Sequence, residues 1–302
     1  MSNILIIKHG SLGDLIQANG AIKDIKNFYP NRKVFLLTTL PYSIFMSECP
    51  YLDGVLIDKR LPRWNLFYLN NLKKTLSKYD FSKVFDLQNS NRTKFYKRFL
   101  IKKVEWSSTE TALEPGQKKK DFDKDPVLDR MEIQLKKSGI ETEFTKNVDL
   151  SWAVENISHL VKKYTNREYI LLFPFCSPKL KNKKWPHFKQ LIQKLKQEFK
   201  NKYSVLLAPG PNEIKEANEL NAKVVLENNE HVTLKTLVSL IYSAKLIIAN
   251  DTGPAHIASH LDKKGLVLFG SHTSAKKVSI ENFNFKAISV KDLNDLDVNT
   301  VL

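Results

Sequence analysis

Short apolar runs alternate with helical patterns along the whole 302-residue chain, and this alternation constrains its fold more than any other feature. Strands that alternate with helices form βαβ units, whose strands build a parallel sheet. The series starts again after residue 150, so we expect two doubly wound α/β domains, residues 1–150 and 151–302, facing each other across a cleft. The expected strands are 3–9, 33–39, 55–59, 83–88, 102–107, 169–175, 204–209, 223–226, 245–250 and 265–269. Residues 123–155, with a helical piece around 130–138, are expected to form a hinge or linker.

Composition and termini exclude several classes of protein. No apolar run approaches the roughly 20 residues that a membrane span needs. The opening segment MSNILIIKHG lacks a basic leader and a cleavage site, which favours a cytoplasmic protein. Cys49 and Cys176 form neither a disulfide framework nor a metal-binding pair, so we expect buried free thiols. The 48 basic and 32 acidic residues give a formal charge of +16, which favours acidic or phosphorylated partners.

The loop after the first strand reads GSLGD and runs into a helix. Neither the G-x-G-x-x-G fingerprint nor a P-loop occurs, so nicotinamide chemistry and P-loop hydrolysis lose their main support. Asp14 stands at the helix start, where a carboxylate either stabilises the helix dipole or serves as a general base. Ligands of doubly wound sheets bind outside the carboxyl ends of the strands, which makes this loop a candidate site.

The segment IIANDTGPAHIA is a second candidate site. Its buried strand ends just before Asp251, and Thr252 and Gly253 follow. Pro254 suits the first turn of a helix, and backbone N–H groups at a helix start bind anions, so a diphosphate would fit there. His256 falls in the first turn, where it is either a packed histidine or part of the site.

Two basic loops also follow expected strands. The first contains Lys179, Lys181, Lys183 and Lys184, followed by a Trp-Pro pair. A lysine run is usually a solvated face, but the Trp-Pro pair would anchor this loop so that ammonium groups reach a phosphate. The second loop holds Lys59, Arg60 and Arg63 beside Trp64, and it faces either an anionic acceptor or water.

Five blocks in one order resemble the heptosyltransferase family, glycosyltransferase family nine, over nearly the whole chain. The blocks are GSLGD, VFDLQNSNRTKFYKRFL, KKWPHFKQLIQKL, VLLAPGPNEIKEANEL and AKLIIANDTGPAHIASHLDKKGLVLFG. The last is the most specific, because the family repeatedly shows Asp-Thr/Ser-Gly, a nearby histidine and a strand that ends in Phe/Tyr-Gly. The resemblance implies the GT-B architecture, two Rossmann-like domains of which the first binds the acceptor and the second the nucleotide-sugar.

The resemblance also implies the activity, an inverting glycosyl transfer that needs no metal and no cofactor. The usual donor is ADP-heptose, and the usual acceptor is the lipopolysaccharide core or a related glycolipid. By position, Asp14 matches the catalytic base and Lys183 matches the lysine that binds the donor diphosphate. The donor-site motif is matched by Asp251, Thr252, Gly253 and His256. The acceptor is expected at Ser11 and Gly13, and more loosely at Lys59, Arg60 and Arg63.

The chain departs from the family at residues 269–274, where FGSHTS stands in place of the frequent Phe-Gly-Pro-Thr-Asp-Pro, and this leaves the donor sugar open. FPFCSPKL likewise replaces the usual His-Pro-Gly-Ala type of loop. A non-catalytic glycan-binding homologue and a nucleotide-sugar epimerase remain as alternatives. The expected state is a monomer that binds no nucleic acid. Residues 92–120 hold nine cations and three acids, so we expect this segment to contact the inner face of the cytoplasmic membrane reversibly.

Overall fold

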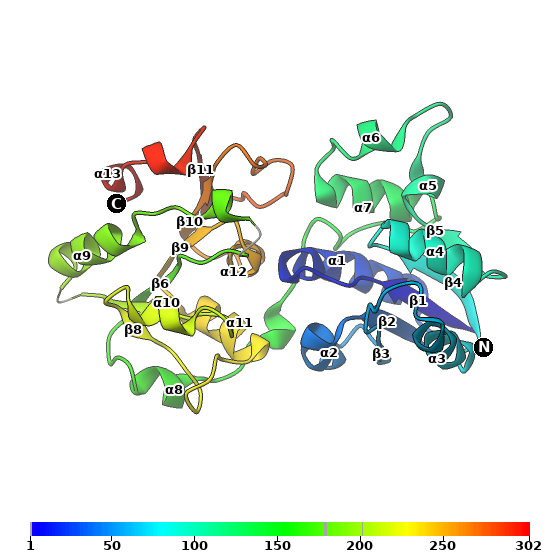
Figure 1. The fold of residues 1–302 in the computed structure, drawn as a ribbon, viewed down its shortest axis with the longest axis horizontal. Coiled ribbons are helices and arrows are strands. Elements are labelled where there is room, and N and C mark those ends of the chain that lie inside the picture. The colour runs from blue at the N-terminus through cyan, green and yellow to red at the C-terminus, as the bar shows by residue number, and fades with distance from the viewer. Residues whose placement is uncertain (1, 178–179, 201) are drawn as a thin grey trace. The chain divides into compact units, whose positions relative to one another are not determined.

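The computed structural model describes residues 2–177, 180–200 and 202–302. The chain forms two compact units, Met1–Trp152 and Ala153–Leu302, each built on its own parallel sheet (Figure 1). The division falls two residues after the expected position at residue 150. Within the described ranges, no helix combines the length and the hydrophobicity of a membrane span.

The sheet of the N-terminal unit has five parallel strands in the order β3-β2-β1-β4-β5. The strands are β1 (Asn3–Ile7), β2 (Val34–Thr38), β3 (Gly54–Ile57), β4 (Phe81–Asp86) and β5 (Glu105–Ser107). The helices are α1 (Leu12–Phe28), α2 (Leu40–Ser47), α3 (Leu66–Ser77), α4 (Asn91–Phe99), α5 (Thr109–Ala112), α6 (Lys119–Phe122) and α7 (Val127–Lys136). The strand order reverses beside β1, as it does in Rossmann-like folds, so the loop after β1 lies at the switch point where ligands bind.

The expected linker is instead mostly part of the N-terminal unit, which corrects the prediction for residues 123–155. The segment carries α7, whose buried side chains include Leu128, Met131 and Leu135. Farther along, the buried Asp24 of α1 accepts a 2.7 Å hydrogen bond from the backbone N–H of Thr145. The backbone passes so close to α1 that a Cβ on Gly20 would lie 1.9 Å from the Phe144 carbonyl oxygen.

The sheet of the C-terminal unit has six parallel strands in the order β11-β10-β9-β6-β7-β8. The strands are β6 (Tyr169–Phe173), β7 (Ser204–Leu207), β8 (Lys223–Val224), β9 (Leu246–Asn250), β10 (Gly265–Phe269) and β11 (Phe285–Ser289). The helices are α8 (Ser158–Lys162), α9 (Phe188–Glu198), α10 (Ile214–Asn218), α11 (Leu234–Ser243), α12 (Gly253–His260) and α13 (Val298–Val301), with 3₁₀ turns η2 (Lys181–Lys183) and η3 (Leu293–Asp295). A further 3₁₀ turn, η1 (Ser151–Ala153), spans the division between the two units. The sequence pattern had not predicted β11, which lies at the edge of the sheet.

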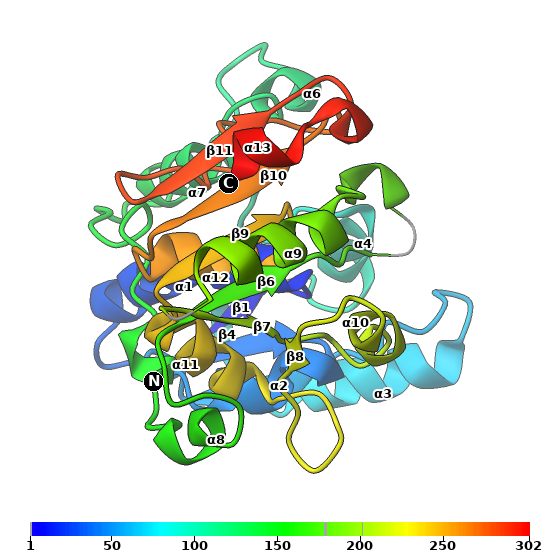
Figure 2. The same ribbon diagram turned by 90° about the vertical axis from the view of Figure 1, so that its left-hand side faces the viewer.

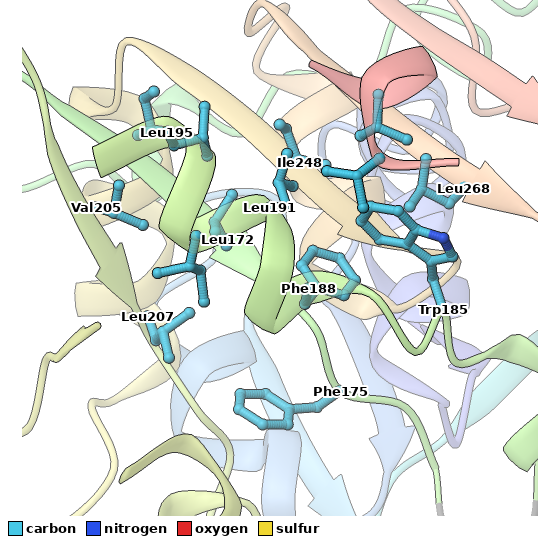
Figure 3. Close-up of a cluster of buried hydrophobic side chains, with 14 of the residues drawn as sticks. Leu172, Phe175, Trp185, Phe188, Leu191, Leu195, Val205, Leu207, Ile248 and Leu268 are labelled. Atoms are coloured by element: carbon cyan, nitrogen blue, oxygen red, sulfur yellow. The ribbon is translucent and has the colours of Figure 1, made fainter. Parts of the chain in front are cut away.

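Helices cover both faces of this second sheet, with α9 and α13 on one face and α11 and α12 on the other (Figures 1 and 2). The apolar face of α9 is buried, as its helical periodicity predicts: Phe188, Leu191, Ile192 and Leu195 pack into the core. Figure 3 shows Phe188, Leu191 and Leu195 against side chains of β6, β7 and β9, with Trp185 in the same cluster. This core therefore fixes the chain on both sides of the lysine-rich loop.

The two cysteines differ in their surroundings. Cys49 is a buried free thiol, as expected, and burial raises its pKa to about 12. Cys176 is also free but only half-buried, so the expectation of a buried thiol is wrong there. It lies in the loop after β6, where the backbone has left the sheet.

Candidate functional site

The loop after β1 presents Ser11 and Asp14 at the first turn of α1. Ser11 donates from its backbone N–H to Asp14 Oδ2 at 3.0 Å and from its hydroxyl to the same oxygen at 2.9 Å. Gly10 has a φ of +111°, and a Cβ there would lie 2.4 Å from the ring of Tyr42, so the turn requires glycine. The Asp14 side chain is 43% exposed, so it serves the helix start and still faces solvent.

A buried lysine lies behind Asp14. Lys8 Nζ is 3.9 Å from Asp14 Oδ1 and donates to the carbonyl of Leu87 at 3.0 Å. Burial lowers the pKa of Lys8, while the nearby carboxylates of Asp14 and Asp86 oppose that shift. Lys8 is therefore the basic neighbour of Asp14 within the unit.

The loop after β3 rests on a fully buried carboxylate, Asp58. Its oxygens accept hydrogen bonds from the hydroxyls of Tyr68 and Tyr96, the latter at 2.6 Å, and His9 Nε2 lies 2.9 Å away. Burial alone would raise the pKa of Asp58, but the hydrogen bonds from His9, Tyr68 and Tyr96 bring it well below its usual range. The carboxylate is therefore ionised, and it ties the ends of β1 and β3 to α3 and α4.

Arg92 also belongs to this network, and it holds the basic loop after β3 in place. Its guanidinium donates to Tyr96 Oη at 3.1 Å and to the carbonyl of Leu61 at 3.0 Å. The side chains of Lys59, Arg60 and Arg63 are exposed. The structure therefore groups Ser11, Gly13 and Asp14 at one turn, and it places the three cations on the separate loop after β3.

In the C-terminal unit, three cationic or titratable side chains converge on the buried carboxylate of Asp251. Lys183 Nζ is 2.5 Å from Asp251 Oδ2, and His272 Nε2 is 3.1 Å from the same oxygen. His256 Nε2 is 3.8 Å from Asp251 Oδ1. The carboxylate is only 3% exposed, whereas Lys183 is 21% exposed, so the lysine is the member of the cluster that a ligand can reach most directly.

The start of α12 adds a backbone donor beside this cluster. Thr252 is the N-cap residue and Pro254 occupies the first turn, as the sequence predicts. The N–H groups of Ala255 and His256 donate to the Thr252 carbonyl and Pro254 has no N–H, so Gly253 supplies the N–H that the first turn offers to an anion. Asp251, Thr252, Gly253 and His256 are thus brought together with Lys183, from a loop 68 residues away in the chain.

Trp185 anchors the lysine-rich loop, as the Trp-Pro pair predicts. Its side chain is buried, its backbone N–H donates to Asn250 Oδ1 at 3.1 Å, and its indole N–H donates to the carbonyl of Leu296 at 2.9 Å. The lysines differ accordingly: Lys183 points to Asp251, whereas Lys184 pairs with Glu216 at the surface. Lys181 is exposed, and Lys179 lies outside the described residues.

Sequence reasoning missed several residues of these two sites. The loop at 271–274, which departs from the family pattern, supplies His272, whose ring stacks on Phe269 with 5.8 Å between ring centres. Lys8 and Asp58 each follow an apolar strand, a position that signals a buried polar group. Within the described part of the chain, no group of three or more His, Cys, Asp or Glu side chains is arranged to hold a metal ion.

Solved structures share this fold over almost the whole chain. "E. coli heptosyltransferase WaaC with ADP" has a TM-score of 0.73 at 19% identity, covering 99% of this chain and 97% of that one. E. coli ADP-heptose lps heptosyltransferase II has a TM-score of 0.73 at 17% identity, with 99% and 96% coverage. The UDP-GlcNAc 2-epimerase from Methanocaldococcus jannaschii has a TM-score of 0.59 at 16% identity, covering 96% of this chain and 89% of that one. These matches establish the GT-B fold.

No curated protein matches the chain by sequence. The sequence model of glycosyltransferase family 9 (heptosyltransferase), however, matches residues 69–292, which is well over half of the chain and spans parts of both units. The match includes Lys183 and the Asp251 cluster. The chain is therefore a glycosyltransferase enzyme and belongs to glycosyltransferase family 9, the heptosyltransferases.

Proposed function

We propose that this enzyme transfers a sugar with inversion, and without a metal ion, from a nucleoside diphosphate sugar to a glycolipid. ADP-heptose is the first donor to test, and the lipopolysaccharide core or a related anionic glycolipid is the first acceptor. The observation that carries the proposal is the cluster of Lys183 and His272 on Asp251 at the start of α12. The ammonium group of Lys183, next to the Gly253 N–H at the positive end of α12, matches the charge of a diphosphate.

The donor half works by exchange of one anion for another. Lys183 is held 2.5 Å from Asp251 and is still partly exposed, so an incoming diphosphate can share or take over its ammonium group. Asp251 and the buried Trp185 keep that ammonium group near the start of α12 in the absence of ligand. This preorganisation lowers the cost of ordering a flexible lysine when the donor binds.

The acceptor half supplies the base in this proposal. Asp14 takes the proton from the acceptor hydroxyl, whose oxygen forms a bond to the anomeric carbon of the donor sugar. The bond from that carbon to the diphosphate oxygen breaks, and its electron pair leaves with the diphosphate. One displacement from the opposite face inverts the anomeric configuration. Lys183 and the Gly253 N–H at the start of α12 stabilise the charge that develops on the leaving group.

The basic loop after β3 suits an anionic acceptor. Lys59, Arg60 and Arg63 are exposed, and among the residues described no carboxylate lies within ion-pair distance of them. Arginine forks onto phosphate oxygens with two parallel hydrogen bonds, so this loop is suited to a phosphorylated glycolipid. Asp58 and Arg92 hold the loop in place from inside the unit.

The experiment is to incubate the protein with ADP-heptose, or with other nucleotide-sugars, with and without a phosphorylated glycolipid acceptor. Release of the nucleoside diphosphate and the anomeric configuration of the product are then measured. We expect diphosphate release that depends on the acceptor and an inverted linkage. Isomerisation of the donor sugar without acceptor would favour an epimerase, and donor binding without any product would favour a binding protein.

A further inference from the structure

Three large apolar side chains project into solvent from the junction between the basic loop and α3. Trp64 is 83% exposed, Leu66 75% and Phe67 78%. The buried face of α3 begins only at Tyr68 and Leu69, so these three side chains take no part in the core of the unit. Adjacent exposed side chains of this size mark an interaction surface, unlike apolar residues scattered singly. We call residues 61–67 the aromatic tip.

The aromatic tip stands on a rigid base. Arg92 donates to the carbonyl of Leu61 with both terminal nitrogens, at 3.0 Å each. At its other end, the side chain of Asn65 caps α3 by accepting the backbone N–H of Tyr68 at 2.9 Å. A preorganised apolar surface loses little conformational entropy when it is buried, which favours binding.

The aromatic tip carries positive charge and has no acidic neighbours in the residues that follow it in sequence. Residues 59–79 contain no Asp or Glu. Lys59, Arg60 and Arg63 lie in or next to the aromatic tip, whereas Lys73, Lys74 and Lys78 lie toward the other end of α3. In the segment 92–120, which the sequence favours for membrane contact, part of the charge is neutralised, because Lys94 and Lys97 both pair with Glu110. Lys119 pairs with Asp123 in the same way. The aromatic tip thus combines exposed apolar side chains with exposed cations that none of the ion pairs among the described residues includes.

We propose that the aromatic tip docks on an anionic lipid bilayer. Trp64, Leu66 and Phe67 enter the headgroup region, and the neighbouring Lys59, Arg60 and Arg63 contact lipid phosphates. Tryptophan and phenylalanine prefer this interface, and basic residues beside them add attraction to anionic lipids. The inference deepens the proposed function, because a glycolipid acceptor lies in such a bilayer. Its test uses neither donor nor acceptor, so the docking surface and the transfer reaction can fail independently.

The test compares two triple variants of the full chain by vesicle flotation. The first is Trp64→Ser, Leu66→Ser and Phe67→Ser. The matched control is Leu40→Ser, Ile44→Ser and Phe283→Ser, which also removes three exposed apolar side chains, 65%, 77% and 88% exposed. Both sets lie at the surface, where substitutions rarely unfold a protein, and thermal unfolding of each variant confirms this.

Vesicles of phosphatidylcholine with phosphatidylglycerol are compared with vesicles of phosphatidylcholine alone. We expect the wild type and the control to bind the anionic vesicles. The partition coefficient of the first variant should be lower by about tenfold or more. Each cation near the surface contributes about fivefold in partitioning, so binding should fall steeply between about 0.1 M and about 1 M NaCl. Equal binding of the two variants, or equal binding to both kinds of vesicle, would overturn the proposal.

Tryptophan fluorescence gives a second readout of the same surface. Trp106 and Trp185 are buried and Trp152 is half-buried, so Trp64 is the tryptophan that a bilayer would change most. We expect its emission to shift to shorter wavelength with anionic vesicles and the shift to be absent in Trp64→Phe. If the aromatic tip instead mediates self-association, concentration-dependent dimers lost in the first variant, without vesicle binding, would refute bilayer docking.

Discussion

Lys183 and Lys184 are neighbours in sequence, yet the structure predicts opposite consequences for their removal. Lys183 lies against the buried Asp251, whereas Lys184 pairs at the surface with Glu216. Two unit charges about 4 Å apart at an effective dielectric constant near 20 interact by about 4 kcal/mol. Part of this is offset because Lys183 gives up its contact with Asp251. We therefore expect Lys183 to contribute about 1.5–3 kcal/mol to the free energy of diphosphate binding, the usual net value of a hydrogen bond to a charged group.

Lys183→Ala should therefore weaken binding of the nucleoside diphosphate product by about 10- to 100-fold. Lys184→Ala removes an exposed ion pair worth about 1 kcal/mol or less, which limits its effect to about fivefold. Isothermal titration with ADP, and with UDP and GDP for comparison, measures both. The loss for Lys183→Ala should be larger at about 10 mM salt than at about 150 mM, because the Debye length falls from about 30 Å to about 8 Å.

The buried carboxylate provides the control for this experiment. Without Lys183, the charge of Asp251 is left beside the diphosphate and repels it. The double variant Lys183→Ala, Asp251→Asn should therefore bind the product more tightly than Lys183→Ala alone, a non-additive result typical of directly interacting residues. Equal losses for Lys183→Ala and Lys184→Ala, or no loss for either, would refute the assignment of Lys183 to the anion site.

Three further predictions concern single groups. Burial, with a smaller contribution from His256, lowers the pKa of His260 to about 3. As the pH falls, the unfolded chain therefore takes up this proton before the folded chain does, and the free energy of unfolding falls below about pH 6.5 by up to about 1.4 kcal/mol per pH unit. Urea unfolding at pH 7 and pH 5 should show that His260→Gln loses less stability between these pH values than the wild type does. Asp58, whose pKa is lowered, stabilises the fold above about pH 4, so Asp58→Asn should cost about 2–3 kcal/mol at pH 7 and less at pH 3.5, and a constant cost would contradict the ionised network. His272→Ala should change relative affinities among nucleotide-sugars, and an unchanged ranking in competitive titration would exclude it from donor selection.

The course of the strands could be predicted because central parallel strands are buried on both faces and appear as continuous apolar runs. β1 is such a strand, with Ile4–Ile7 fully buried. β11 could not be predicted in this way, because it is an edge strand with an exposed Lys286 between its apolar residues. The segment after residue 123 is not the linker that its polar sequence predicts. It is bound to α1 through Asp24, a residue 121 positions before Thr145, and local sequence does not reveal such a contact.

The sequence predicts where the individual motifs of the candidate site lie, but it does not predict which side chains of different motifs contact one another. The turn motifs located Asp14 and Asp251, because a helix start after a buried strand has the same local pattern wherever it occurs. The pairing of Asp251 with Lys183 and His272 spans 68 and 21 residues, respectively, and arises only from the strand order. The spacing of residues within one motif therefore cannot predict such contacts.

The most direct test of the account is acceptor-dependent release of the nucleoside diphosphate by the wild type and by Asp14→Asn, with donor affinity measured on the same preparations. Asp14 and the donor cluster belong to different units, so donor affinity should stay unchanged while turnover falls by about 10²- to 10⁴-fold. Turnover of Asp14→Asn close to that of the wild type would contradict the account and leave Asp14 as a helix-capping residue.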